Sequence, residues 1–319
     1  MKSLLTDMNG WSAGRLNSTG RTHVIPEKTM RVLFTGASSV PGQRVLEQLL
    51  ARENVSEIWC ALHKHDVALD HPKLRKLALD VTSQVCLDTI PRPLDLVIHF
   101  AAVTHAVDEA AYWEVNLQGT KRLAEQAQAL GCRRFFYVST RCAVAGNGAY
   151  GESKLAAEEA LKKMTWDSLL ILQPAELYGG GSREGLDKFV SLAARLHVVP
   201  LLWGNQNIQF APLHLDDFVE CVFRLIGSDA KGVKIVELCG PERLNGATLA
   251  LRLARKYKAA PLPVWWPAVT LLLKALGVLG FHPATPDQIS RLVGPKTASV
   301  SSEECRSSDM IRFPQNAMV

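Results

Sequence analysis

Two polar side chains near the middle of the chain have the types and the spacing for proton transfer. Tyr150 and Lys154 stand four positions apart in a helical stretch, so they lie side by side on one helix face. A free phenol titrates at about pH 10, but a neighbouring ammonium favours the phenolate and lowers that pKa. The pair therefore predicts acid–base chemistry at a hydroxyl or carbonyl oxygen.

A third group should hydrogen-bond the same substrate oxygen. Thr140, at the end of the preceding apolar strand, is the first choice, and its neighbour Ser139 is the second. Ten positions separate Thr140 from Tyr150, so the connection between them is short.

Other polar residues fit structural roles better than catalytic ones. His99 stands within an apolar strand, and His214 stands beside the start of a helix. Asp216 and Asp217 fit N-capping of that helix, because their carboxylates can accept from its free amides.

A glycine-containing turn has the pattern of a pyrophosphate site. In Thr35-Gly-Ala-Ser-Ser-Val-Pro-Gly42, Gly36 and Gly42 fill the first and third glycine positions, and Ser39 replaces the middle one. Glycines let the backbone turn tightly and approach the phosphates, which then lie on the amides of a helix N-terminus. We expect a dinucleotide to contact Gly36, Ser38, Ser39, Val40 and Gly42.

Short apolar runs alternate with helical stretches through the first half of the chain. The expected strands are Arg31–Thr35, Glu57–Leu62, Leu74–Leu79, Leu94–Phe100, Arg134–Ser139 and Ser168–Leu172. The expected helices are Pro41–Arg52, Tyr112–Leu130 and Tyr150–Met164. Nearly continuous apolar strands separated by helices predict an α/β fold, a doubly wound parallel Rossmann sheet covered on both faces.

The pattern divides the chain into four parts. Residues 30–177 are expected to form the dinucleotide-binding domain, and 178–300 a smaller C-terminal substrate-binding region partly interleaved with the sheet. Residues 1–29 lack the apolar run of a secretory signal and are interpreted as a disordered leader. Residues 301–319 are interpreted as a tail.

Composition narrows the class of protein. A hydrophobic content of 47% indicates a packed globular protein, and a net charge of +5 without a concentrated basic face argues against a nucleic-acid partner. Seven cysteines without a Cys-x-x-Cys pair predict reduced thiols, no metal site and a cytoplasmic protein.

The apolar segment Val264–Gly280 falls short of the roughly 20 residues that span a bilayer. We expect a buried or lid helix there, with a lipid-facing interfacial helix as the alternative.

Several segments, in order along the chain, resemble the extended short-chain dehydrogenase/reductases of the NAD-dependent epimerase/dehydratase family. They are the phosphate turn, Leu79-Asp-Val81, Asp95–Ala102, Val115–Thr120, Tyr150-Gly-Glu-Ser-Lys154, Leu172–Gly179, Leu213–Asp217 and Leu238–Pro241. The resemblance runs from about Met30 to about Val293.

The resemblance implies NAD or NADP as the cofactor. It also implies that Lys154 holds the nicotinamide ribose and that Tyr150 exchanges a proton with the substrate while hydride passes. Further cofactor contacts would come from Asp80, Val81, Phe100, Ala101, Ala102, Asn116, Pro174 and Leu177. At the end of the second strand, Lys64 suits the 2′-phosphate of NADP and favours it slightly, while Asp66 would suit NAD.

Two departures bear on the substrate. The family's loop between the residues that match Thr140 and Tyr150 is longer, and Asn207–Pro212 lacks the arginine that clamps a diphosphate, with Arg183 and Arg195 as the available substitutes.

The leading interpretation is an oxidoreductase or epimerase acting on a secondary alcohol or ketone of a sugar or nucleotide-sugar. The alternatives are a reductase of a sterol-like or flavonoid-like ketone, and a non-catalytic NADPH-binding subunit resembling the accessory subunit of respiratory complex I. The resemblance also allows a homodimer.

Overall fold

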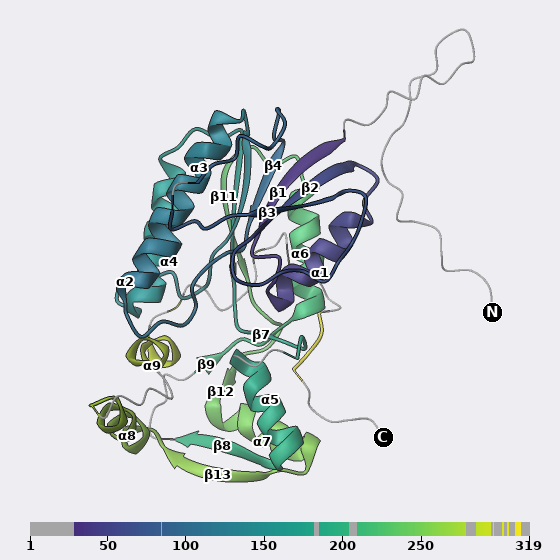
Figure 1. The fold of residues 1–319 in the computed structure, drawn as a ribbon. Coiled ribbons are helices and arrows are strands. Elements are labelled where there is room, and N and C mark those ends of the chain that lie inside the picture. The colour runs from purple at the N-terminus through teal and green to yellow at the C-terminus, as the bar shows by residue number, and fades with distance from the viewer. Residues whose placement is uncertain are drawn as a thin grey trace, which may run out of the picture.

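A computed structural model describes residues 29–83, 85–181, 185–203, 209–278 and 285–294, together with 296, 302, 305 and 310–313. Nearly all of the expected leader and most of the expected tail lie outside these residues. The described part forms a large sheet-containing domain with a smaller lobe at one end (Figure 1).

The large domain is built on a seven-stranded sheet whose strands are all parallel, in the order β11-β6-β5-β4-β1-β2-β3. This confirms the predicted doubly wound Rossmann sheet. Six strands follow the predicted positions closely, and β11 comes from the C-terminal half of the chain. Their bounds are β1 Met30–Thr35, β2 Val55–Leu62, β3 Leu74–Ala78, β4 Leu96–His99, β5 Arg134–Val138, β6 Ser168–Pro174 and β11 Gly232–Leu238.

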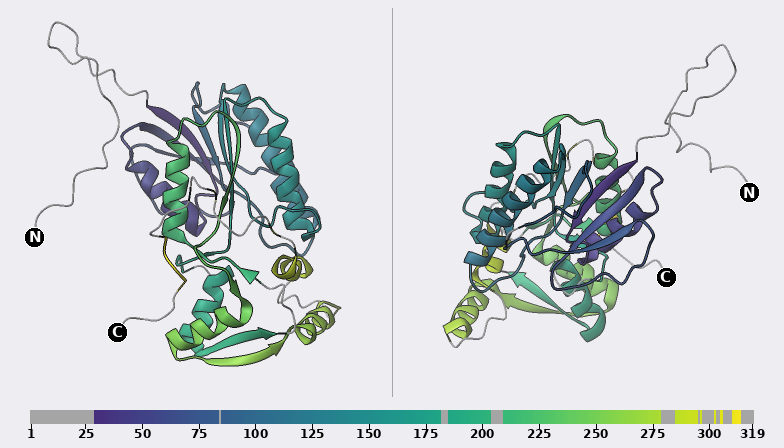
Figure 2. Two further views of the ribbon diagram at one scale, coloured as in Figure 1. Left: turned by 180° about the vertical axis from the view of Figure 1, so that it is seen from behind. Right: turned by 45° about the horizontal axis from the view of Figure 1, so that its top comes forward.

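Helices cover both faces of the sheet because side chains alternate along each strand. Phe34 and Ile98 pack in one core with α1 (Val40–Leu50) and α6 (Leu215–Ile226). Their neighbours Leu33 and Val97 point to the other face, against α3 (Thr120–Ala129) and α4 (Gly148–Lys162). The two helix layers lie on opposite sides of the sheet (Figures 1 and 2).

The helix expected over Tyr112–Leu130 is not a single α-helix. It begins as α2 (Ala110–Tyr112), widens into the π-helix η1 (Trp113–Gly119) and continues as α3. Each turn of a π-helix contains about one residue more than a turn of an α-helix, and this changes the direction of the side chains that follow. Asn116 and Gly119 are the buried residues of this π-helix.

The smaller lobe is made of helices α5 (Gly185–Leu196), α7 (Gly246–Tyr257), α8 (Trp266–Val278) and α9 (Pro286–Val293), with three two-stranded sheets. These sheets pair β8 (Val198–Trp203) with β13 (Ala260–Trp265), β7 (Leu177–Tyr178) with β10 (Leu213–His214), and β9 (Gln209–Phe210) with β12 (Leu244–Asn245). The lobe has its own apolar core, which includes Phe210, Leu249 and Leu253.

The structure corrects two predictions about local roles. His214 is the N-cap of α6, since its Nδ1 atom accepts from the Asp216 amide at 3.2 Å, and the two aspartates lie in the first turn. Asp216 and Asp217 stand two and three positions after this N-cap, so neither carboxylate is in the capping position. Asp217 instead accepts from the amide of Ile311 at 2.9 Å, which ties the C-terminal segment to α6.

The prediction that all cysteines are reduced is wrong for one pair. Cys221 on α6 and Cys305 form a disulfide, with 5.4 Å between their Cα atoms. They are 84 residues apart, so their spacing along the chain gave no indication of the bond. Within the described residues no group of three or more His, Cys, Asp or Glu side chains could hold a metal ion.

The apolar segment that begins at Val264 is divided between the end of β13 and helix α8. No helix among the described residues is long and apolar enough to cross a membrane. Of the two forms expected here, a buried helix or a lid helix, the buried form is excluded for part of α8. Trp266 is buried, whereas Leu271 and Leu272 are 70% and 58% exposed.

Truncating a buried side chain on a central strand should leave a cavity and lower the free energy of unfolding. We expect Ile98→Ala to lower the free energy of unfolding by about 2–5 kcal/mol, because Ile98 is fully buried on β4. Ile235→Ala on the edge strand β11, where the side chain is 41% exposed, is the matched control and should cost roughly 0.5 kcal/mol or less. Urea unfolding of both variants measures the difference; equal losses would contradict the assignment of β4 to the core.

Candidate functional site

The turn after β1 is held against the end of β4 by a close backbone contact. Gly36 has φ +78°, and a Cβ atom there would lie 2.6 Å from the amide nitrogen of Ala101 and 2.7 Å from the carbonyl carbon of Phe100. At Gly42 a Cβ would lie 2.2 Å from the Gly36 oxygen. Both positions therefore require glycine, and the turn brings the N-terminus of α1 to the carboxyl edge of the sheet.

Ser39 keeps the turn intact although it replaces a glycine. Its hydroxyl donates to the Gly36 carbonyl at 2.8 Å and accepts from the Gly42 amide at 3.1 Å, which makes it the N-cap of α1. The side chain thus points into the turn and binds its own backbone. The neighbouring residues Ser38 and Val40 complete the turn, so the five residues predicted to contact a pyrophosphate lie together.

The predicted nucleotide contacts beyond β2 and β3 also lie at this edge. His63 Nε2 is 3.3 Å from Asp80 Oδ2, and Thr82 holds the Asp80 carboxylate through its amide and hydroxyl. These hydrogen bonds from Thr82 lower the pKa of Asp80. Asp66 forms an ion pair with Lys76 at 2.9 Å, while Lys64 is exposed.

The segment after β4 is fixed by buried polar contacts. The Asn116 amide accepts from Val103 N at 2.9 Å and donates to Val103 O and to the Ser153 hydroxyl, each at 3.1 Å. Asn116 thereby ties the segment that contains Phe100, Ala101 and Ala102 to helix α4. Val81 packs against Gly119 of the same π-helix, where an added Cβ would lie 2.8 Å from its Cγ2.

His99 has the structural role expected from the sequence. It is fully buried, and its ring nitrogens contact the Thr35 hydroxyl at 2.6 Å and the Thr120 hydroxyl at 2.9 Å. Burial, followed by the charge of Lys154, lowers the pKa of His99 to about 3. The ring is therefore neutral near pH 7 and links β1 to α3.

Tyr150 lies in the first turn of α4, and only 9% of it is exposed. Burial raises the pKa of its phenol to about 12, against the lowering effects of the Arg291 charge and of a hydrogen bond with Thr140. The structure thus brings together Tyr150 and Thr140, the residue predicted to share its substrate oxygen. At neutral pH the phenol is protonated.

The second-choice residue, Ser139, is directed elsewhere. Its hydroxyl donates to the buried carboxylate of Glu158, which also accepts from Gln173 Nε2 at 2.9 Å. Burial raises the pKa of Glu158. The contact engages Ser139 on the α4 side of the sheet and leaves Thr140 as the hydroxyl beside Tyr150.

Lys154 lies one turn along α4 from Tyr150, as the spacing predicts, but its ammonium contacts β5 and not the Tyr150 phenol. Its Nζ atom donates to the Val138 carbonyl at 2.7 Å and lies 4.1 Å from the centroid of the Tyr137 ring. Burial lowers the pKa of Lys154 to about 7, against the raising effect of Glu158. The ammonium therefore does not supply the effect on the Tyr150 pKa that the sequence analysis assigned to it.

The cation beside Tyr150 is Arg291, which the sequence analysis missed. Its guanidinium carbon is 4.4 Å from the centroid of the Tyr150 ring, and it donates to the Thr104 carbonyl at 2.7 Å. Asp287, one turn earlier on α9, pairs with Arg291 at 3.0 Å and accepts from the Tyr150 amide at 2.9 Å. Helix α9 therefore covers the first turn of α4. Only the fold brings α9 to α4, so no local pattern marks these two residues.

The remaining predicted contacts lie where the sheet meets the smaller lobe. Pro174 ends β6, and its carbonyl accepts from the Arg141 amide at 3.0 Å, while Leu177 begins β7. Nearby, the buried Arg141 donates to the Gln209 carbonyl at 3.1 Å and pairs with Glu176 at 3.3 Å.

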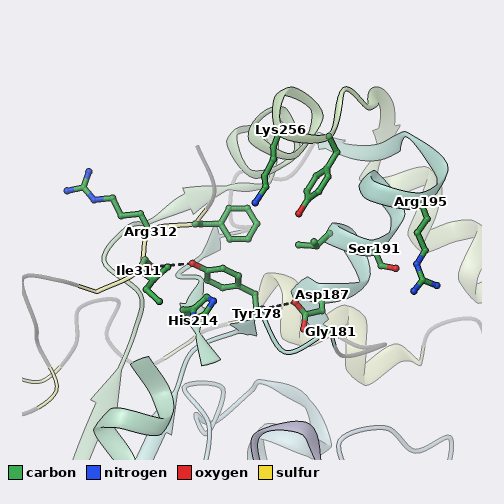
Figure 3. Close-up of a pocket in the computed structure, with 13 residues that line it drawn as sticks. Tyr178, Gly181, Asp187, Ser191, Arg195, His214, Lys256, Ile311 and Arg312 are labelled. Atoms are coloured by element: carbon green, nitrogen blue, oxygen red, sulfur yellow. Dashed lines mark hydrogen bonds between the residues drawn. The ribbon is translucent and has the colours of Figure 1, made fainter. Parts of the chain in front are cut away.

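The stretch in which the sequence lacks the family's diphosphate-clamping arginine is mostly apolar where the structure describes it. Phe210 is buried in the core of the smaller lobe, and Ala211 is buried in the core between the sheet and helices α1 and α6. Arg183 and Asn207 lie outside the described residues. Arg195 lines a different cavity of about 700 Å³ beside Tyr178, and neither Tyr150 nor Lys154 lines that cavity (Figure 3).

Comparison with known proteins agrees with this geometry. Residues 32–239 match the model of the family described as "NAD dependent epimerase/dehydratase family". The chain belongs to that family. The family is one of NAD-dependent enzymes, as the turn after β1 and the edge of the sheet suggest.

Individual relatives act on chemically different compounds. A ceramide reductase of Caulobacter vibrioides (strain NA1000 / CB15N) is 32% identical over 152 residues, which are 46% of this chain and 47% of that protein. A 3-beta-hydroxysteroid dehydrogenase of Mycolicibacterium neoaurum is 26% identical, covering 56% of each chain. The chain thus spans about half the length of these two relatives. A UDP-glucose 4-epimerase of Vibrio cholerae is 24% identical, covering 73% of this chain and 79% of that protein.

Solved structures share the fold at low sequence identity. The dTDP-glucose 4,6-dehydratase DesIV of Streptomyces venezuelae, solved with NAD and TYD bound, superposes with a TM-score of 0.64. It is 23% identical, and the match covers 74% of this chain and 84% of that one. The likeness supports the doubly wound architecture.

The contact at Gly36 yields a test of the nucleotide site. We expect Gly36→Ala to abolish binding of NADH and NADPH in a fluorescence titration, because the new methyl group collides with the backbone that follows β4. Gly131→Ala is the matched control: Gly131 also has positive φ, +81°, but a Cβ there meets nothing within 4 Å. If both variants bound nucleotide equally well, the turn after β1 would not be the pyrophosphate site.

Proposed function

We propose that this chain is an NAD(P)-dependent oxidoreductase that interconverts a ketone and a secondary alcohol, with Tyr150 as the group that transfers the proton. The observation that carries the proposal is the grouping of Tyr150, Thr140 and Arg291 in a buried site, with Lys154 one helical turn away. A group with this surrounding chemistry at the end of a nucleotide-binding sheet is a candidate for acid–base catalysis.

The residues of the turn fit a dinucleotide. Gly36 and Gly42 carry no side chain that would cover the backbone, and the turn lies at the N-terminus of α1, the end of a helix that attracts anions. Ser38, Ser39 and Val40 would share the pyrophosphate contacts, Asp80 and Val81 those of the adenine, and Lys154 the ribose. A bound nicotinamide supplies the hydride acceptor or donor.

We further propose that NADP is preferred over NAD. The support is at the end of β2: Asp66 is paired with Lys76, whereas Lys64 is exposed and carries a charge that suits a 2′-phosphate. Parallel titrations with NADH and NADPH test the preference, and Lys64→Ala should reduce it.

The protonation state of Tyr150 favours the reducing direction. With a pKa of about 12 the phenol holds its proton at neutral pH and can donate it to the oxygen of a bound ketone. Thr140 hydrogen-bonds the phenol and the same substrate oxygen in this proposal. Arg291 stabilises the negative charge that develops on the phenol oxygen as the proton leaves.

A hydrophobic ketone is the proposed substrate class. Support comes from the buried apolar residues Phe210 and Ala211 at the position expected for a diphosphate clamp, and from the short connection between Thr140 and Tyr150. The ceramide reductase and the 3-beta-hydroxysteroid dehydrogenase have lipid-like substrates by name. This choice reverses the order suggested by the sequence analysis.

A nucleotide-sugar is the second candidate. The UDP-glucose 4-epimerase match covers more of this chain than the lipid-related matches do. Arg141 and Lys296 also donate to the Gln209 carbonyl, at 3.1 and 3.0 Å, and place two cations near the position where the clamp is missing. Absorbance assays with reduced nicotinamide compare sterol-like and long-chain ketones with nucleotide-sugars. Retention of nucleotide with no turnover of either class would favour the non-catalytic accessory subunit.

We expect Tyr150→Phe to reduce ketone turnover by roughly 10²–10⁴-fold, because the variant has no proton to donate, while nucleotide affinity changes little. Tyr257→Phe on α7 is the matched control and should retain full turnover. Equal activity of wild type and Tyr150→Phe would rule out the proposed proton transfer.

Arg291 should set the pH dependence of the reverse, alcohol-oxidising reaction, which requires the phenolate. Its positive charge lowers the pKa of Tyr150, so Arg291→Met should raise that pKa and move the alkaline limb of kcat/KM to higher pH. At fixed alkaline pH the rate falls about tenfold for each unit of displacement. Arg291→Lys keeps the charge and should restore part of the limb. A uniform loss at every pH in both variants would show that Arg291 only holds α9 in place.

A further inference from the structure

The outermost part of the smaller lobe exposes large apolar side chains. Trp203 and Trp265, paired at the ends of β8 and β13, are 53% and 51% exposed, with 6.2 Å between their ring centroids. Helix α8 follows directly and exposes Leu271 and Leu272. We call these four residues the apolar tip; on β13, Leu262 extends it with 49% exposure.

In the lobe around this tip basic residues outnumber acidic ones, which include Asp187 on α5 and Asp287 on α9. Residues 188–215 and 243–286 contain no Asp or Glu, but they contain Lys188, Arg195, Arg243, Arg252, Arg255, Lys256, Lys258 and Lys274. The rest of the chain has fewer Lys and Arg than Asp and Glu, so the net charge of +5 comes from these two segments. Arg195 precedes β8, and Arg255 and Lys258 precede β13, so these cations lie at the opposite end of the two strands from Trp203 and Trp265. Lys188, Arg195, Arg255 and Lys258 are exposed.

We propose that the apolar tip docks on the surface of a membrane that contains anionic phospholipids. Tryptophan side chains favour the boundary between lipid and water, and leucines on a short helix enter the acyl region while basic residues attract the headgroups. Helix α8 has 13 residues, too few to cross a bilayer, so it would lie in the plane of the interface. The proposal stands on the surface and does not depend on the proposed oxidoreductase activity.

The position of the tip adds a reason for such docking. Helix α8 lies beside α9 in two views of the molecule, and α9 carries the arginine that covers Tyr150 (Figures 1 and 2). Contact of the tip with lipid would bring this side of the candidate site close to the interface. A lipophilic compound would then have a short path from the bilayer.

Co-sedimentation of the full chain with vesicles tests the proposal. The probe vesicles contain phosphatidylcholine with about 30 mol% phosphatidylserine, and the comparison vesicles contain phosphatidylcholine alone. We expect at least tenfold stronger binding to the anionic vesicles, and loss of most of that binding when the salt concentration is raised. Binding that is equal for both vesicles, or absent from both, would overturn the proposal.

Matched variants locate the surface. The double variant Leu271→Glu/Leu272→Glu should weaken vesicle binding at least tenfold, whereas Val233→Glu/Ile235→Glu on the exposed edge strand β11 should leave it unchanged. Arg255→Glu/Lys258→Glu provides a second test that leaves the apolar residues in place, and it too should weaken binding. Thermal melting confirms that each variant is folded.

Oligomeric state separates lipid from a second copy as the occupant. If wild type is a dimer by sedimentation equilibrium, the Leu271/Leu272 variant is a monomer, and neither binds vesicles, the tip is an interface between copies and the proposal fails. Vesicle binding by wild type that all variants retain in full also overturns it.

Discussion

The contact between the backbone at Gly36 and the backbone after β4 is the constraint on which the site depends. Two parallel strands end side by side, and the turn that leaves one of them must pass within van der Waals distance of the segment that leaves the other. This close passage directs the start of α1 toward the carboxyl edge. The Thr35 hydroxyl strengthens it through contacts with the Ala101 amide at 3.3 Å and with His99. The turn after β1 and the segment after β4 thus share one anchor.

Burial has opposite effects on the two titratable groups of α4. It raises the pKa of the Tyr150 phenol and lowers that of the Lys154 ammonium, because each charged form loses hydration. A spacing of four residues therefore does not ensure that the lysine charge acts on the tyrosine. A carbonyl and an aromatic ring hold the ammonium, and a guanidinium from α9 provides the charge beside the phenol. The smaller lobe thus contributes a positive charge beside Tyr150 of the large domain.

The sequence was sufficient for those features that depend on local pattern. Strand periodicity gave the parallel sheet, and the glycines and Ser39 gave the turn, because both depend on neighbours along the chain. The roles predicted for the nucleotide contacts and for Tyr150 remain predictions to be tested. Arg291, Asp287 and the Cys221–Cys305 bond were not found, since each partner comes from a distant segment. The exposure of Leu271 and Leu272 was left open between a buried or lid helix and an interfacial one, because an apolar run has the same pattern in a core and on a surface.

The length of the π-helix η1 sets the direction in which the side chains of α3 point, and with it the contact between Thr120 and His99 on β4. Each residue advances an α-helix by about 100°. Loss of one residue from Trp113–Gly119 would let the segment return to ordinary α-helical winding, and everything downstream would rotate by roughly that angle relative to Asn116. Thr120 would then turn away from His99, and the hydroxyl contact between α3 and β4 would be broken. The length of this segment, more than its composition, is therefore under constraint.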